Sequence, residues 1–136
     1  MTHAREMIQT NPSQGSLDTD TLVECIEACF DCAQACTACA DACLGEQEEI
    51  QRLVRCIRLD LDCADICFAT GSILSRQTAS EPKLARMTLE ACSHACRLCG
   101  EECEQHAKHM EHCRVCAAAC RRCESACNSV LSAMRA

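Results

Sequence analysis

Cysteine accounts for eighteen of the 136 residues of this chain and recurs at a helical spacing. From Cys25 to Cys43 the cysteines alternate steps of four and three residues, and two similar rows cover residues 92–103 and 113–127. The complete set is Cys25, Cys29, Cys32, Cys36, Cys39, Cys43, Cys56, Cys63, Cys67, Cys92, Cys96, Cys99, Cys103, Cys113, Cys116, Cys120, Cys123 and Cys127. Steps of three and four mark the buried seam of a packed helix, where a bundle normally carries Leu. The sequence therefore predicts helices whose buried faces are lined by thiols.

Thiols at this density favour a soft metal, and Cu(I) fits best. Thiolates select Cu(I), Zn(II) or iron–sulfur clusters. Cysteines three or four residues apart on a helix lie about 5–6 Å apart at Cβ, and such a pair suits two-coordinate Cu(I). Zinc sites usually use cysteines on loops, and the iron–sulfur run Cys-x2-Cys-x2-Cys-x3-Cys-Pro is missing from the sequence. Cu(I) on one thiolate is also neutral, whereas Zn(II) on four thiolates leaves two negative charges in a low-dielectric interior. We expect multiple Cu(I) ions per chain, with a capacity on the order of the thiol count.

A second group of potential ligands contains one carboxylate, three histidines and one methionine. Asp60 occupies a seam position, where an unpaired carboxylate is costly, so we expect it to pair with His106 or a metal, or else to be half exposed. His106 continues a cysteine row by one turn, which favours a ligand role over a solvated surface histidine. His109, Met110 and His112 follow in the same segment, and each is either a further ligand or a solvated residue; the Met thioether is a soft Cu(I) donor.

The elements that must position these groups are four helices in one domain. The chain has only two aromatic residues, both Phe, four Gly and two Pro, which fits long helices and a core filled by sulfur. Short connections predict an all-α, antiparallel up-down-up-down four-helix bundle with a cysteine-lined core. We expect a 1–17 N-terminal arm and an 18–136 copper-binding bundle. The expected helices cover residues 18–45, 48–76, 80–106 and 111–134.

Local signals predict where these helices begin and end. Thr21 and Glu24 fit a capping box, and Gly45 fits a left-handed residue after a helix. Ser80 fits an N-cap, with Pro82 in the first turn. The segment 105–112 contains no Gly or Pro, so one continuous helix is the alternative to the tight hairpin that we favour near residues 106–110.

Antiparallel packing predicts two different ends of the bundle. One end, which we call the mouth, gathers Cys39, Cys43, Leu53, Cys56, Asp60, His106, His109, Met110 and His112. The other end gathers Leu22, Leu74, Leu89, Leu131 and Met134. Because only the mouth carries polar metal ligands, we expect ions to enter there.

Charge and composition exclude several functions. A net charge of −7 argues against nucleic acid or an anionic membrane surface as a partner. The sequence has no apolar run of about 18 residues and no apolar signal peptide at its start, so we expect a cytoplasmic protein. In a reducing cytosol, dense cysteine indicates metal or redox chemistry. No nucleophile–base set or phosphate loop is apparent, so we do not expect an enzyme.

The in-phase cysteine rows and the His/Met-rich turn of residues 106–112 resemble those of the bacterial copper storage proteins, and the lack of an export signal resembles the cytosolic branch. The resemblance covers residues 19–134. It implies Cu(I) storage and copper homeostasis, copper ligation by all eighteen cysteines, entry at the histidine-bearing end, and a homotetramer. The second helix departs from a regular row, because Leu53 and Asp60 stand where further thiols would fit.

Two alternatives come from a different functional class. A zinc-stapled structural protein would bind about four or five ions at four thiolates each. A thiol switch would close disulfides between helices and bind no metal. Metal stoichiometry separates both from Cu(I) storage.

Overall fold

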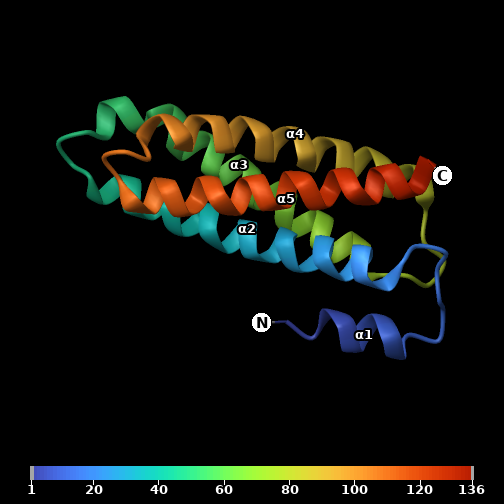
Figure 1. The fold of residues 1–136 in the computed structure, drawn as a ribbon. Helices are drawn as coiled ribbons and strands as arrows, with labels where there is room; N and C mark the ends of the chain where they lie inside the picture. Colours follow the sequence, from blue (N-terminus) through green and yellow to red (C-terminus); the bar gives the residue numbers. More distant parts are fainter. Residues whose placement is uncertain (1, 136) are drawn as a thin grey trace.

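The structure is a computed structural model that describes residues 2–135, and it contains helices but no strand in that range. The helices are α1 (Ala4–Thr10), α2 (Thr19–Gly45), α3 (Ile50–Ser75), α4 (Pro82–His106) and α5 (Glu111–Arg135). The four long helices run alternately up and down; successive helices pack together, and α5 closes the ring against α2 (Figure 1). The predicted all-α, antiparallel four-helix bundle is confirmed.

The core of the bundle consists largely of sulfur. All eighteen cysteines are buried, and the most exposed of them, Cys39, is only 2% exposed. Ile26, Leu53, Leu89 and Val130 are the larger apolar side chains that accompany them in the core. Each long helix turns its row of three- and four-residue steps inward, as the periodicity predicts.

The start of α2 differs from the predicted capping box. Asp18 is the N-cap, and its carboxylate accepts a hydrogen bond from the backbone N–H of Thr21 at 3.0 Å. Asp18 also accepts from the Thr21 hydroxyl, so Thr21 supports the cap from inside the first turn. The Thr21–Glu24 capping box is therefore wrong, because an acid three residues earlier satisfies the free N–H.

The predicted end of the first long helix at Gly45 and Pro82 in the first turn of α4 are confirmed, but the left-handed geometry at Gly45 and the Ser80 N-cap are wrong. Gly45 is the last residue of α2, and no glycine in residues 2–135 has a positive φ. The N-cap of α4 is Glu81, with Pro82 in the first helical position and no side-chain cap. In the loop between α3 and α4, Ala79 has a left-handed backbone conformation, with φ of 52°. The chain therefore turns one residue before Ser80.

The N-terminal arm contains a helix that the sequence did not predict. Helix α1 packs on α2 and buries Ile8, and the Arg5 guanidinium donates a hydrogen bond to Asp20 at 2.7 Å. The hydroxyl of Thr2 also donates to Glu27 at 2.9 Å. Only one of the seven residues of α1 is buried, so its sequence has no hydrophobic periodicity that would predict a helix. The division into arm and bundle stays a prediction.

The connection between α4 and α5 is a tight turn of four residues. The backbone N–H groups of His109 and Met110 both donate to the carbonyl of His106, at 3.1 and 3.0 Å. Met110 is buried, and its carbonyl accepts from the N–H of Cys113 in the first turn of α5. The structure thus has the predicted hairpin here and not one continuous helix.

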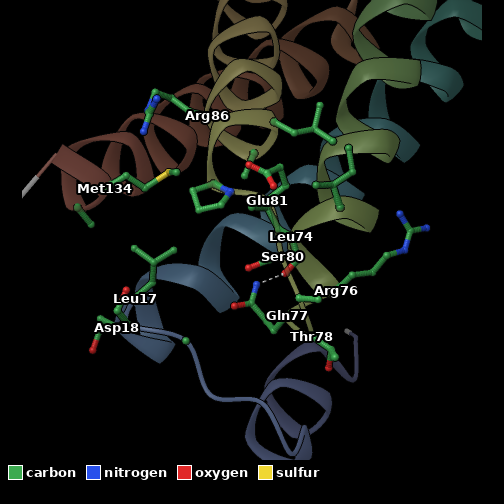
Figure 2. A pocket seen from close by; sticks show the side chains of 18 residues that line it. Leu17, Asp18, Leu74, Arg76, Gln77, Thr78, Ser80, Glu81, Arg86 and Met134 are labelled. Carbon is green, nitrogen blue, oxygen red and sulfur yellow. Dashed lines mark hydrogen bonds between the residues drawn. The ribbon is translucent and has the colours of Figure 1, made fainter.

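The end of the bundle opposite the mouth is filled with hydrocarbon. Leu22, Leu74, Leu89 and Leu131 are buried there, and Met134 is partly buried against them. Outside this layer lies a cavity of about 720 Å³ between the α1–α2 loop, the α3–α4 loop and the end of α5 (Figure 2). Its lining includes no Cys or His among the described residues. None of the helices within residues 2–135 combines the length and hydropathy that a membrane span requires.

Candidate metal centre

The inward rows from the four long helices meet in one column of sulfur atoms. Neighbouring Sγ atoms lie 3.6–4.0 Å apart, both within a helix and between helices. The pair Cys25–Cys127, at 3.9 Å, lies near the hydrocarbon-filled end, and the pair Cys56–Cys103, at 3.7 Å, lies near the mouth. No disulfide joins cysteines in residues 2–135. The column therefore presents free thiols along the bundle axis.

Within this column, sulfurs from three helices form groups of four. All ligand atoms of a group lie within 4.8 Å of one another, a separation that a single ion can bridge. Four of the groups contain sulfur alone: Cys29, Cys92, Cys123 and Cys127; Cys32, Cys63, Cys67 and Cys96; Cys32, Cys36, Cys63 and Cys120; and Cys36, Cys99, Cys116 and Cys120. Several sulfurs belong to two groups, so ions in adjacent groups would share ligands.

Burial has the largest effect on the protonation of Cys43. Near the mouth, loss of solvation raises the pKa of Cys43 to about 12, and the charges of Cys56 and Asp60 act in the same direction. At neutral pH this thiol is protonated, because few favourable partners would stabilise a buried thiolate there. A metal ion that binds it must therefore displace a proton.

Asp60 lies fully buried among the thiols of α4 and α5. Its Oδ1 atom accepts hydrogen bonds from the Sγ atoms of Cys99 at 3.0 Å, Cys116 at 3.3 Å and Cys103 at 3.5 Å. Oδ2 has no hydrogen-bond partner among the described residues. Burial raises the pKa of Asp60 to about 7, and the charge of Cys116 adds to this effect. The expected pairing with His106 is wrong, and so is the alternative of half exposure.

His106 binds a different acid at the mouth. Its Nε2 lies 3.0 Å from Oε2 of Glu102, one helical turn earlier on α4, and both side chains are about nine-tenths buried. Arg55 of α3 lies 3.5 Å from the other oxygen of Glu102. Glu102 therefore fixes the imidazole of His106 near the surface and keeps it away from Asp60.

His112 is directed into the sulfur column. Its Nδ1 lies 3.4 Å from Sγ of Cys39 and 3.6 Å from Sγ of Cys113, while its Nε2 lies 3.0 Å from Oε2 of Glu46. Cys43 completes a group of four ligand atoms within 4.8 Å of one another. In this group an imidazole joins three thiols.

His109 and Met110 line an open cavity at the mouth, and His106 lines it with them. The cavity has a volume of about 360 Å³ and is also bordered by Glu46, Glu49, Arg52 and Leu53. His109 is exposed, whereas Leu53 is fully buried at the base of the cavity. The polar mouth and the hydrocarbon-filled opposite end thus occur where the topology places them.

A comparison with models of known protein families shows to which family this chain belongs. The family model described as copper storage protein matches residues 18–132, which is most of the chain. The chain belongs to the copper storage protein family.

Solved structures of one bacterial member of the copper storage family resemble this chain closely. Ccsp from Streptomyces lividans, loaded with 10 copper equivalents, is 49% identical, with a TM-score of 0.92 over 95% of this chain and 98% of that one. A structure of copper loading to a cytosolic copper storage protein from the same organism, with five coppers, is 52% identical, with a TM-score of 0.83 over 87% and 98% of the two chains. A histidine-to-alanine variant of Ccsp is 52% identical, with a TM-score of 0.85 over 88% and 99%. Among curated proteins, none matched the chain significantly.

In this copper storage family member, sequence reasoning placed the eighteen thiols in the core but missed two acids at the mouth. Glu102 stands four residues before His106, a spacing that places the two side chains on one helix face and was available as a signal. Glu46, in the α2–α3 connection, contacts His112 in the first turn of α5, and the sequence gives no signal for this contact. The structure brings the eighteen thiols, Asp60 and His112 into one connected group; their roles as ligands stay predictions.

Proposed function

We propose that this copper storage family member stores and sequesters many Cu(I) ions in the cytosol, on the thiolates that line its bundle. The observation that carries the proposal is the column of eighteen buried sulfurs, most of which have a neighbouring sulfur 3.6–4.0 Å away. A bundle built for stability alone would use Leu at most of these positions, because Leu buries more apolar surface than Cys. The Streptomyces lividans relative, described as cytosolic and seen with five and with 10 coppers, supports the same role here.

Charge balance explains how a buried column can fill with metal. Each thiol that binds Cu(I) releases its proton, so one positive charge replaces another and the interior gains no net charge. An ion that bridges two sulfurs 3.6–4.0 Å apart requires only small side-chain rotations. Capacity is then limited by the supply of ligands, and shared sulfurs link neighbouring ions into clusters.

We propose that ions enter at the mouth. The cavity of about 360 Å³ is lined by the imidazole-bearing residues His106 and His109 and by Met110. Beyond it lie His112 with Cys39 and then Asp60, whose free Oδ2 is available as a further ligand. The hydrocarbon layer at the opposite end offers no such ligand, which supports entry from one end.

The homotetramer that the family resemblance implies remains a proposal, and the outer face of α3 supports self-association. Val54, Leu61 and Phe68 recur every seven residues on this face and are 61%, 42% and 61% exposed. If the α3 helices of two copies pack antiparallel, with Leu61 at the centre of the contact, Val54 lies beside the partner's Phe68. The same pairing sets Arg58 near the partner's Asp65, so the face is complementary to itself in charge.

The test is an anaerobic Cu(I) titration of fully reduced protein against a chromophoric Cu(I) chelator. We expect tight binding that continues to a plateau near the number of cysteines per chain, because each thiolate is a ligand. A plateau at a few equivalents, or at none, would contradict storage. Zinc content and free-thiol counts on the same sample would then separate the zinc-stapled and thiol-switch alternatives.

A further inference from the structure

Three thiols and one imidazole at the mouth form a group whose ligand set differs from that of the sulfur-only groups. Cys39 and Cys43 come from the last turns of α2, and His112 and Cys113 from the first turn of α5. The four ligand atoms lie within 4.8 Å of one another, and the group shares no residue with the four sulfur-only groups described above.

The separations in this group match a tetrahedral zinc site. Zn(II) binds thiolate at about 2.3 Å and imidazole at about 2.0–2.1 Å, so a regular tetrahedron has edges of roughly 3.5–3.8 Å. The Cys39–Cys113 edge is 3.9 Å, and the edges from His112 Nδ1 to Cys39 and Cys113 are 3.4 and 3.6 Å. The Cys43 sulfur lies within 4.8 Å of the other three ligand atoms and is the candidate for the fourth vertex.

Glu46 prepares His112 to bind through Nδ1. Its Oε2 lies 3.0 Å from Nε2 of His112, so a neutral imidazole that donates from Nε2 to Glu46 turns the lone pair of Nδ1 toward the sulfurs. A carboxylate behind a metal-binding imidazole is the usual partner of zinc histidines, because it fixes the ring and increases its basicity. The side chains of His112 and Glu46 are 26% and 38% exposed, so an ion reaches this group from solvent.

The net charge that remains after Zn(II) binds differs between this group and the sulfur-only groups. Zn(II) on three thiolates and a neutral imidazole leaves one negative charge close to solvent. Zn(II) on four thiolates leaves two negative charges in the buried interior, next to further sulfurs and Asp60. The penalty for Zn(II) is therefore smallest at the mouth.

We propose that Cys39, Cys43, His112 and Cys113 form a zinc site at the mouth, which binds a single Zn(II) per chain in the copper-free protein. Binding is a ligand exchange without oxidation: three thiols release three protons, and the metal loses water as it takes three sulfurs and one nitrogen. The site lies beside the proposed Cu(I) entrance, so bound Zn(II) occupies ligands that an entering Cu(I) ion needs. The inference does not depend on Cu(I) storage, since it rests on the geometry of four residues.

The experiment uses reduced, copper-free, full-length protein under anaerobic conditions. Zn(II) is titrated against a chromophoric chelator, and Co(II) is titrated separately because its absorption spectrum reports geometry and thiolate ligation. The variants are His112→Ala, Cys43→Ser and Glu46→Gln. His94→Ala is the matched control, because His94 is exposed on α4 and lies beside Arg97, away from the mouth.

One Zn(II) equivalent is expected, together with tetrahedral Co(II) bands and sulfur-to-Co(II) charge transfer. His112→Ala and Cys43→Ser should remove tight binding, and Glu46→Gln should weaken it by about 10- to 100-fold with the Co(II) spectrum retained. Several equivalents that do not respond to His112→Ala, or no tight binding at all, would overturn the site. Circular dichroism establishes that each variant is folded. A Cu(I) titration of the same samples that still reaches the thiol count would leave storage intact while the zinc site fails.

Discussion

Asp60 occupies a position in this core that is energetically costly for a carboxylate. A carboxylate in a low-dielectric interior is penalised unless it is neutralised or fully hydrogen-bonded, and here only Oδ1 has partners. A pKa of about 7 means that much of the population carries a proton on Asp60 at neutral pH. Such a costly side chain at the place where thiols converge fits a metal ligand better than a structural role.

The raised pKa of Asp60 predicts how the stability of copper-free protein depends on pH. The folded protein holds this proton up to about pH 7, whereas the unfolded chain releases it near 3.8, so stability falls as pH rises through that window. Between pH 5 and pH 8 the loss is on the order of 2 kcal/mol. Asp60→Asn should flatten this part of the profile in urea unfolding of reduced protein, monitored by circular dichroism.

The control for this prediction is an exposed acid on the same helix. Asp62 is solvent-exposed on α3, so Asp62→Asn should leave the pH profile unchanged. If Asp60→Asn retains the full slope between pH 5 and pH 8, other groups dominate the pH dependence and the protonation of Asp60 in the folded state is wrong.

Among the elements, the α4–α5 hairpin determines which end of the bundle is open. It places His106, His109 and Met110 around the mouth cavity, and it starts α5 so that His112 turns inward. A continuous helix would have separated these groups, since residues 106 and 112 would lie about 9 Å apart along one axis.

Loss of the outer histidines should slow Cu(I) uptake but leave the final capacity nearly intact. His106→Ala combined with His109→Ala removes two donors from the cavity and leaves all eighteen thiols in place. Stopped-flow absorbance after mixing reduced protein with a Cu(I) donor complex measures the rate, and the equilibrium titration measures capacity. His94→Ala should behave as the unmodified protein. Uptake as fast as in the unmodified protein would contradict entry past these histidines.

The sequence predicted the helix rows well because each row depends on a local period. The burial of a thiol at every third or fourth position needs no knowledge of other segments, and all eighteen positions are buried. The helix ends were less predictable, because Asp18 and Thr21 both fit a cap and only the folded backbone selects between them. The pairs Glu46–His112 and Asp60–Cys99 join different helices or connections, so they depend on tertiary packing that a single sequence does not specify.

At the scale of the whole molecule, the proposed contact between copies uses the outer face of α3. Phe68 is held by an edge-to-face contact with Phe30 of α2, with ring centroids 5.7 Å apart. Phe30 in turn lies over Gly71, where any side chain would meet its ring at 3.0 Å. This support keeps an exposed aromatic in a fixed position, as an interface anchor requires.

The proposed pairing of α3 helices predicts a charge-swap result. Arg58→Asp should place like charges near the partner's Asp65 and lower the molar mass measured by light scattering after size exclusion. Adding Asp65→Arg to the same chain restores opposite charges and should recover the original mass. Leu84→Asp, at a similarly exposed apolar position on α4, is the control. A mass that responds to Leu84→Asp and not to Arg58→Asp would place the interface elsewhere.

The hydrocarbon layer of Leu22, Leu74, Leu89 and Leu131 has a consequence for the order in which metal ions would bind and leave. A tube closed at one end admits and releases its contents through the same opening. If ions enter at the mouth as proposed, the first ions to arrive would move to the closed end, near Cys25 and Cys127, and would leave only after the ions nearer His112. The ion that bound last would then be released first. A partly filled molecule would exchange only the ions nearest the mouth with the surroundings.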